Sequence, residues 1–202
     1  MRKAAFLGLV IGLVAVSATA EAAWQRGSTV TAYARAMPSF PATSPSRFSI
    51  TTTNSGGPAN AGVVNTGDKL VLTFTGSTVV PGSVVVGWNG SAYGVRVRFL
   101  SSASPCVTVQ DGTSLLELNV GHLDCATAYA TSTDDFSTST MTLANNVVTI
   151  RLRGGQNTAK VASQTLTWQP ATNPTGSPGP NPTDAAGHPA TNSLTQGPAE
   201  FF

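Results

Sequence analysis

The chain has 202 residues, of which 10% are charged, and its formal net charge at neutral pH is +2. A composition this close to neutral excludes an electrostatic basis for binding nucleic acid or an anionic membrane surface. Thr, Val and Ser are abundant, and residues that favour helices never recur at helical spacing. We therefore expect an all-β protein that is long enough to bury a core of its own.

The first 23 residues have the layout of a secretory signal peptide. Arg2 and Lys3 give a positive start, and an apolar run follows at residues 4–16. Small residues then offer cleavage after Ala20, Ala22 or Ala23. The apolar run is shorter than the about 20 residues that a membrane-spanning helix needs. We predict that residues 1–23 are removed and that the protein is secreted, extracellular or at the cell surface, without a stable membrane span.

Alternating apolar and polar residues between turn residues predict a series of short strands along the rest of the chain. The predicted strands cover residues 28–37, 47–53, 68–75, 84–88, 93–100, 106–110, 114–120, 139–143, 147–152 and 162–168. Regular short strands of this kind, without helices, are typical of a two-sheet sandwich. The sequence shows no internal repeat, which indicates a single unit.

Two pairs of turn residues predict tight hairpins. Asn89 and Gly90 stand between the fourth and fifth predicted strands, and Asn145 and Asn146 stand between the eighth and ninth. All four residues accept the positive φ angles that two-residue hairpin turns require. We expect each pair to join two neighbouring antiparallel strands.

The C-terminal part of the chain is rich in proline, with seven of the 13 prolines in residues 170–198. Two alternatives stay open for residues 171–202. They form either a disordered linker or a Pro/Gly-rich loop that ends in a final edge strand. The aromatic ending at Phe201 and Phe202 keeps the second alternative open, because a free tail would have little use for it.

Cys106 and Cys125 are the only two cysteines. Both lie in the part of the chain that is predicted to be exported, where oxidation is expected. A bridge between them would close a loop of about 20 residues and stabilise the fold by about 3 kcal/mol in the chain-entropy model. Their spacing is not that of a CxxC redox or metal pair, so we predict a structural disulfide.

Four segments carry a resemblance to a known family. They are GDKLVLTFTGSTVVPGSVVVGWNG at residues 67–90, STMTLANNVVTIRL at 139–152, LTWQP at 166–170 and TDAAGH at 183–188. Together they resemble bacterial immunoglobulin-like domains of secreted and surface proteins, and residues 22–38 resemble the start of mature secreted proteins common in actinobacteria. The resemblance implies an immunoglobulin-like, two-sheet antiparallel β-sandwich at residues 24–170 that is extracellular and non-catalytic.

The match departs from the family and from antibody domains at identifiable positions. His188 stands where the family usually has Asn. Antibody domains place a buried Trp between two distant cysteines that bridge the sheets. Here Cys106 and Cys125 are close in sequence and Trp88 precedes both. The likeness is therefore to the architecture rather than to antibody domains themselves.

The sequence contains little that points to catalysis. His122 and His188 are the only histidines, and Ser91 is not centred in a G-x-S-x-G motif. Fingerprints for zinc proteases, phosphate loops and dinucleotides are absent from the sequence. Asp134 and Asp135 form the only acidic pair, which indicates a solvated turn rather than calcium ligands. We predict that the protein is not an enzyme and needs no cofactor or metal.

Arginines and aromatic residues give two hypotheses for a ligand surface. Arg96 and Arg98 share one face of a strand, as do Arg151 and Arg153, and all four together would bind an anionic cell-wall polymer if their strands were neighbours. Like charges opposite each other destabilise a sheet, so separation or pairing with acids is the alternative. Trp24, Trp88, Trp168, Tyr33 and Tyr93 would form a sugar-binding platform if exposed, or part of the core if buried.

From these features we predict a secreted or cell-surface immunoglobulin-like module with a structural or adhesive role. The alternative is a carbohydrate- or cell-wall-binding module. The expected partners are a cell-wall polymer, a glycan or another surface protein, and not nucleic acid. A third hypothesis is self-assembly, in which the predicted strand at residues 28–37 adds to the sheet edge of a neighbouring copy.

Overall fold

The computed structural model describes residues 44–55, 61–155, 158, 161, 163–172, 174 and 181–202. The predicted signal peptide and the predicted strand at residues 28–37 lie outside these residues. The described elements are β1 (Ser46–Thr53), β2 (Lys69–Thr75), α2 (Pro81–Val84), β3 (Tyr93–Phe99), β4 (Val107–Asp111), β5 (Glu117–Cys125), β6 (Asp134–Ala144), β7 (Val147–Arg151), β8 (Gln164–Gln169) and β9 (Leu194–Ala199). The prediction of an all-β protein is confirmed.

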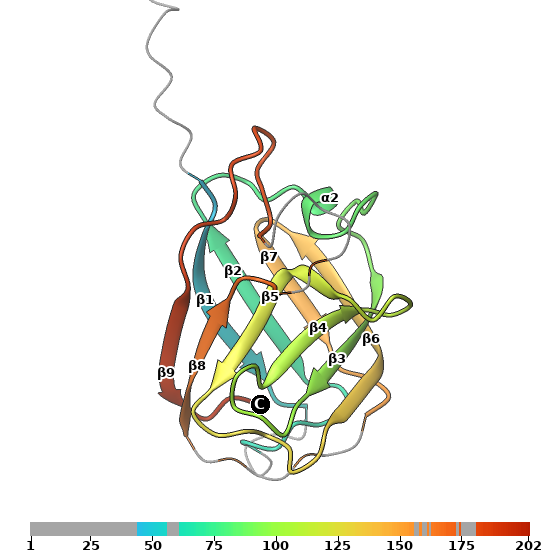
Figure 1. Cartoon of the computed structure of the whole chain (residues 1–202), viewed down its shortest axis with the longest axis vertical. Coiled ribbons are helices and arrows are strands. Elements are labelled where there is room, and N and C mark those ends of the chain that lie inside the picture. Colours follow the sequence, from blue (N-terminus) through green and yellow to red (C-terminus); the bar gives the residue numbers. More distant parts are fainter. Residues whose placement is uncertain are drawn as a thin grey trace, which may run out of the picture. The chain divides into compact units, whose positions relative to one another are not determined.

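The strands form one sheet in the order β1-β2-β7-β6-β3-β4-β5-β8-β9, and every neighbouring pair is antiparallel. Because the number of strands is odd and their directions alternate, β1 and β9 at the two ends run parallel. These ends approach each other, and Ser46 and Thr191 form a parallel bridge beside them. The sheet thereby curls into a nearly closed barrel, with β1, β2 and β7 behind β8, β5, β4 and β3 in Figure 1.

This hydrogen bonding is that of a single continuous sheet. It supports the antiparallel all-β class at the coarse level. The finer prediction of two separate sheets packed as an immunoglobulin-like sandwich stays a prediction.

Alternate residues of the strands fill the inside of the barrel. The pattern is regular in β2, where Leu70, Leu72 and Phe74 are buried while their neighbours are not. At one end of the core, four aromatic rings meet edge to face, with ring centroids 5.4–5.8 Å apart. They are Phe99, Tyr129, Phe136 and Phe202. The C-terminal residues therefore belong to the same core as the strands.

The predicted hairpin at Asn145 and Asn146 is confirmed. These residues have φ angles of 49° and 64°, and they join β6 to β7 with Ala144 opposite Val147. Positive φ at both turn positions matches the right-handed twist of the two strands.

The predicted strand at residues 84–88, and with it the hairpin at Asn89 and Gly90, is wrong. Pro81 fits the first position of a helical turn, and the Val85 N–H donates to its carbonyl at 3.2 Å to close α2. Gly90 has a different role, because its φ is 91° and a Cβ there would stand 2.7 Å from the carbonyl oxygen of Leu143. The glycine thus permits a close approach to β6 instead of turning a hairpin.

The end of the chain forms a strand. β9 pairs with β8, and the chain then continues into the barrel, where Phe201 and Phe202 are buried. Of the two alternatives for the tail, the described residues 181–202 therefore follow the one with a final strand.

Candidate functional site

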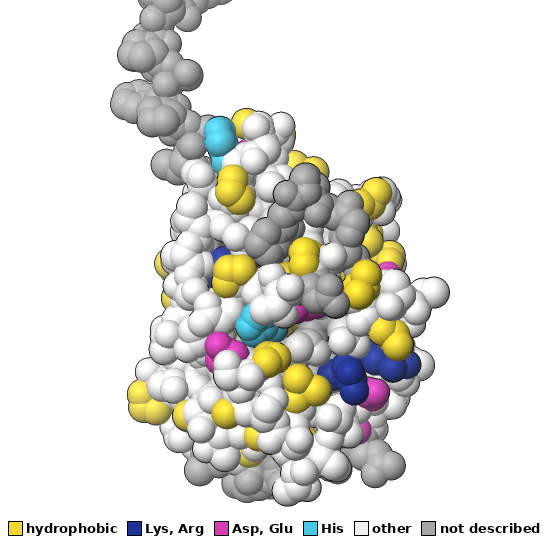
Figure 2. Space-filling model, in the orientation of Figure 1, with side chains coloured by type: hydrophobic (Ala, Val, Ile, Leu, Met, Phe, Trp, Pro, Cys, Tyr) yellow, Lys and Arg dark blue, Asp and Glu magenta, His cyan; other side chains and the backbone are white. Residues whose placement is uncertain are grey.

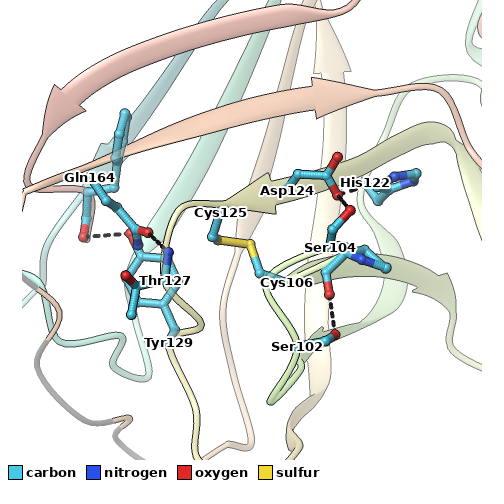
Figure 3. The surroundings of a disulfide bond; sticks show 11 residues. Ser102, Ser104, Cys106, His122, Asp124, Cys125, Thr127, Tyr129 and Gln164 are labelled. Atoms are coloured by element: carbon cyan, nitrogen blue, oxygen red, sulfur yellow. Dashed lines mark hydrogen bonds and ion pairs between the residues drawn. A yellow bond between two sulfur atoms is a disulfide. The ribbon is translucent and has the colours of Figure 1, made fainter.

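The disulfide links two neighbouring strands of the sheet where β4 begins and β5 ends. Cys106 directly precedes β4 and Cys125 ends β5, with 5.7 Å between their Cα atoms. Figure 3 shows that Ser104 lies beside this bridge and donates a hydrogen bond to Asp124 at 2.8 Å. The predicted pairing of Cys106 with Cys125 is present in the structure, where it holds the loop before β4 against the end of β5.

The four candidate arginines do not form one row. Arg96 and Arg98 lie on β3, Arg151 ends β7, and Arg153 follows β7. Strand β6 lies between β3 and β7, so the two pairs are separated. This separation removes the repulsion that four adjacent guanidinium groups would create.

Arg96 and Arg98 also share an acidic partner. The Arg98 Nε donates to Asp135 Oδ1 at 2.8 Å, and Arg96 Nη1 lies 3.6 Å from Asp135 Oδ2. About a third of each of the three side chains is exposed. Such pairs at a surface contribute at most about 1 kcal/mol, so this group adds little to the stability of the fold.

Next to this pair, polar side chains continue across the outer side of the sheet. Cross-strand partners run from Asp135 on β6 to Arg98, Thr108, His122 and then Gln169 on β8. A second, shorter line runs from Arg96 through Gln110 to Glu117. Directly paired residues point to the same side of a sheet, and the apolar residues between them face the core.

We call this set of residues on the outer side of the sheet the outer polar face, in which Thr108, Glu117 and His122 are buried. It consists of Arg96, Arg98, Thr108, Gln110, Glu117, His122, Asp124, Asp135 and Gln169. In Figure 2, basic and acidic side chains and a histidine lie in a band across the middle of this side of the molecule.

His122 is held between two carboxylates on its own strand. Its Nδ1 lies 2.9 Å from Glu117 Oε1, and its Nε2 lies 3.8 Å from Asp124 Oδ1. The other oxygen of Glu117 accepts hydrogen bonds from both the N–H and the hydroxyl of Thr172, each at 2.9 Å. Burial raises the pKa of Glu117, but the hydrogen bonds from His122 and Thr172 outweigh it and leave that pKa below its usual value.

Three buried polar atoms of the outer polar face have no hydrogen-bond partner among the described residues. They are Arg96 Nε, Thr108 Oγ1 and Gln110 Oε1. Folded proteins contain few such atoms, because each costs about 1–3 kcal/mol. These three lie on two adjacent strands, β3 and β4, whereas the other such atoms, at Arg47, Asn119, Asp134 and Gln164, are spread over other parts of the barrel.

The other candidate residues, aromatic and polar, lie in the core or form contacts within loops and turns. Trp88 and Trp168 are 8% and 0% exposed, so both belong to the core and neither offers a platform for a sugar ring. Trp24 and Tyr33 lie outside the described residues. His188 contacts Asp184 at 3.0 Å in the loop before β9, and Ser91 bonds to Asn89 within its turn.

Sequence reasoning identified the arginines but missed their acidic partner and most of the outer polar face. Asp135 stood out only as half of an acidic pair, and Glu117 did not stand out at all. The available signal was the alternation of polar residues in three successive strands, at Arg96 and Arg98, at Thr108 and Gln110, and at His122 and Asp124. Only the strand order shows that these three pairs are neighbours.

Comparison with protein-family models, with curated proteins and with solved structures found no match to this chain. Within the described residues, no helix has the length and apolar character needed to cross a membrane. The same residues hold no group of three or more His, Cys, Asp and Glu side chains placed to bind a metal ion.

Proposed function

We propose that the chain is a secreted, non-catalytic module with a structural or adhesive role at the cell surface. The observation that carries this proposal is the outer polar face, a broad set of polar side chains on a sheet that a disulfide and a continuous core hold rigid. Its histidine and most of its acidic side chains already form hydrogen bonds with other groups of the protein. Glu117 is engaged by His122 and Thr172, and Asp124 by Ser104. Groups fixed in this way suit recognition better than proton transfer.

The proposal includes the immunoglobulin-like architecture of secreted and surface proteins. The all-β fold and the four sequence segments quoted above support it. The predicted signal peptide supports extracellular placement, as does a disulfide, which persists in oxidising compartments.

The test is retention of the purified secreted protein on intact cells and on isolated cell wall. We expect the protein to sediment with the wall and to be released when soluble wall fragments compete. A protein with its disulfide intact that stays in the supernatant on cells and walls alike would overturn the adhesive role.

A carbohydrate- or cell-wall-binding module is the second candidate function, and the outer polar face favours it. The burial of Trp88 and Trp168 weakens the version that depends on stacking by those aromatic rings.

A further inference from the structure

We propose that the outer polar face binds an uncharged carbohydrate, with Arg96, Thr108 and Gln110 as its main contacts. This inference rests on the proposed adhesive function and names the ligand class and the residues. It is carried by the arrangement of donors and acceptors, by the unpartnered buried atoms and by the balance of charge on this face.

The arrangement alternates hydrogen-bond donors and acceptors along the sheet. Arg98 donates, Asp135 accepts, and Thr108 and Gln110 do both. Each hydroxyl of a sugar is also both a donor and an acceptor, and adjacent hydroxyls match the two ends of a guanidinium, amide or carboxylate group. From β6 to β8 the face crosses five strands, which is roughly 19 Å at the usual strand spacing, enough for more than one sugar ring.

The unpartnered atoms show where a ligand would gain most. Thr108 is 8% exposed and its hydroxyl oxygen has no partner among the described residues, and the same holds for Gln110 Oε1 and Arg96 Nε. The contact of Arg96 Nη1 with Asp135 is 3.6 Å long, which exceeds a hydrogen bond. Arg96 can therefore leave this contact at little cost and meet ligand hydroxyls beside Gln110, its cross-strand neighbour.

The balance of charge decides between a neutral and an anionic polymer. The two arginines of the face stand beside three carboxylates, those of Asp135, Glu117 and Asp124, and Arg151 and Arg153 lie beyond β6. A surface that binds a polyanion needs an excess of positive charge, which this face lacks.

The experiment measures retention of the secreted protein on cellulose, chitin and mannan as neutral probes and on polygalacturonate as an anionic probe. We expect retention on a neutral probe that persists in about 1 M salt, where the Debye length is about 3 Å. The double variant Thr108→Val with Gln110→Ala should weaken retention about tenfold or more, since it removes two ligand hydrogen bonds. Arg96→Ala should weaken it as well.

Matched controls lie on the opposite side of the barrel. Thr149 and Arg151 of β7 project outward as Thr108 and Arg96 do, and β7 is two strands away from β3. Thr149→Val and Arg151→Ala should leave retention unchanged. The unfolding midpoint of every variant is measured alongside its retention. If the double variant does not fold, retention is measured for the single variants Thr108→Val and Arg96→Ala instead.

The outcomes separate this inference from the proposed function. Retention on polygalacturonate alone, abolished by salt, would overturn the ligand class and leave an adhesive protein. Retention on a neutral probe that neither Thr108→Val with Gln110→Ala nor Arg96→Ala changes would overturn the site. Binding to intact cell wall but to no glycan probe would overturn the inference and leave the adhesive role, whereas no binding to cells, walls or probes would overturn both.

Discussion

Asp111, at the end of β4, illustrates how a single carboxylate organises a turn. Its Oδ1 accepts the N–H groups of Ser114 and Thr113 at 2.6 and 2.9 Å, and its Oδ2 accepts the hydroxyl of Tyr93 at 2.5 Å. These hydrogen bonds, led by the one from Ser114, lower the pKa of Asp111 to about 2. The hydrogen bond between Tyr93 and Asp111 is also the main reason why the pKa of Tyr93 rises to about 12.

The lowered pKa of Asp111 predicts a specific dependence of stability on pH. A carboxyl whose pKa is lower in the folded state stabilises the fold above its unfolded pKa of about 3.9, and this contribution is lost as the pH falls. The stability advantage of the wild type over Asp111→Asn should therefore grow from pH 2 to about pH 5 and then stay constant. Denaturant unfolding of both proteins at several pH values measures it. If the wild type and Asp111→Asn differ in free energy of unfolding by the same amount at pH 2 and pH 5, the pKa of Asp111 is not lowered by folding.

Among the elements, the hairpin between β6 and β7 does more than reverse the chain. Asn145 and Asn146 both have positive φ, and Asn146 also makes hydrogen bonds with its side chain. Its Oδ1 accepts the N–H of Val79 at 2.9 Å and its Nδ2 donates to Ser77 O at 3.2 Å. The turn thereby fastens the segment that follows β2.

A pair of glycine variants separates these two roles. Glycine accepts positive φ at either position, so Asn145→Gly should change the free energy of unfolding by less than about 0.5 kcal/mol. Asn146→Gly loses two side-chain hydrogen bonds and leaves Val79 N–H and Ser77 O unpaired, so it should cost about 2 kcal/mol. Urea denaturation of the two variants provides the comparison. Equal effects would show that the bonds to Val79 and Ser77 contribute nothing.

Elements with a local signal could be predicted from the sequence, and elements fixed by distant contacts could not. The alternation of Leu70, Leu72 and Phe74 gives β2, and the two asparagines give the β6–β7 turn. Val84, Val85 and Val86 are apolar and β-branched, yet Pro81 starts a helical turn that ends at Val84. The Trp88 indole also donates to Ser91 O at 2.6 Å. These contacts override the strand propensity.

The outer polar face was inaccessible to sequence reasoning for a related reason. Arg96 and Arg98 were correctly placed on one side of a strand, but their neighbours depend on the sheet order. β3 pairs with β6, which lies some 35 residues further along the chain. Such non-local pairing leaves no trace in a window of neighbouring residues, so Asp135 could not be assigned as the shared partner of the arginines.

For the whole molecule, the segment that ends in β9 brings the two ends of the nearly closed barrel together. β1 and β9 meet along a seam that side chains complete, because Asn192 Oδ1 accepts the N–H of Arg47 and Gln196 Oε1 accepts that of Ile50. The Arg47 guanidinium is buried, donates to Asn192 O and Asn181 Oδ1, and lies 5.1 Å from the centre of the Trp168 ring. Burial lowers its pKa to about 10. Side chains here satisfy strand edges that would otherwise be open to pairing with another chain.

Beyond the seam, Phe202 enters the aromatic cluster and completes the core. Its ring is 2% exposed and stands 5.5 Å from the ring centres of both Phe99 and Tyr129. Its N–H donates to Thr52 on β1 at 2.7 Å, and its carbonyl oxygen accepts the Gly62 N–H at 2.7 Å. The tail is therefore joined to the first strand of the barrel by both its backbone and its side chain.

This docking predicts that Phe202→Ala destabilises the whole barrel and not only its own segment. Loss of a fully buried Phe typically costs about 3–5 kcal/mol, and the backbone bonds to Thr52 and Gly62 are retained in this variant. Phe48 on β1 is the matched control: it is 63% exposed, so Phe48→Ala should change stability by less than about 0.5 kcal/mol. Thermal unfolding of Phe202→Ala should remain a single transition at a lower temperature, because tail and strands share one core. Equal, small effects of the two substitutions would show that the tail rests on the barrel without closing it, and an early separate transition would show that it unfolds independently.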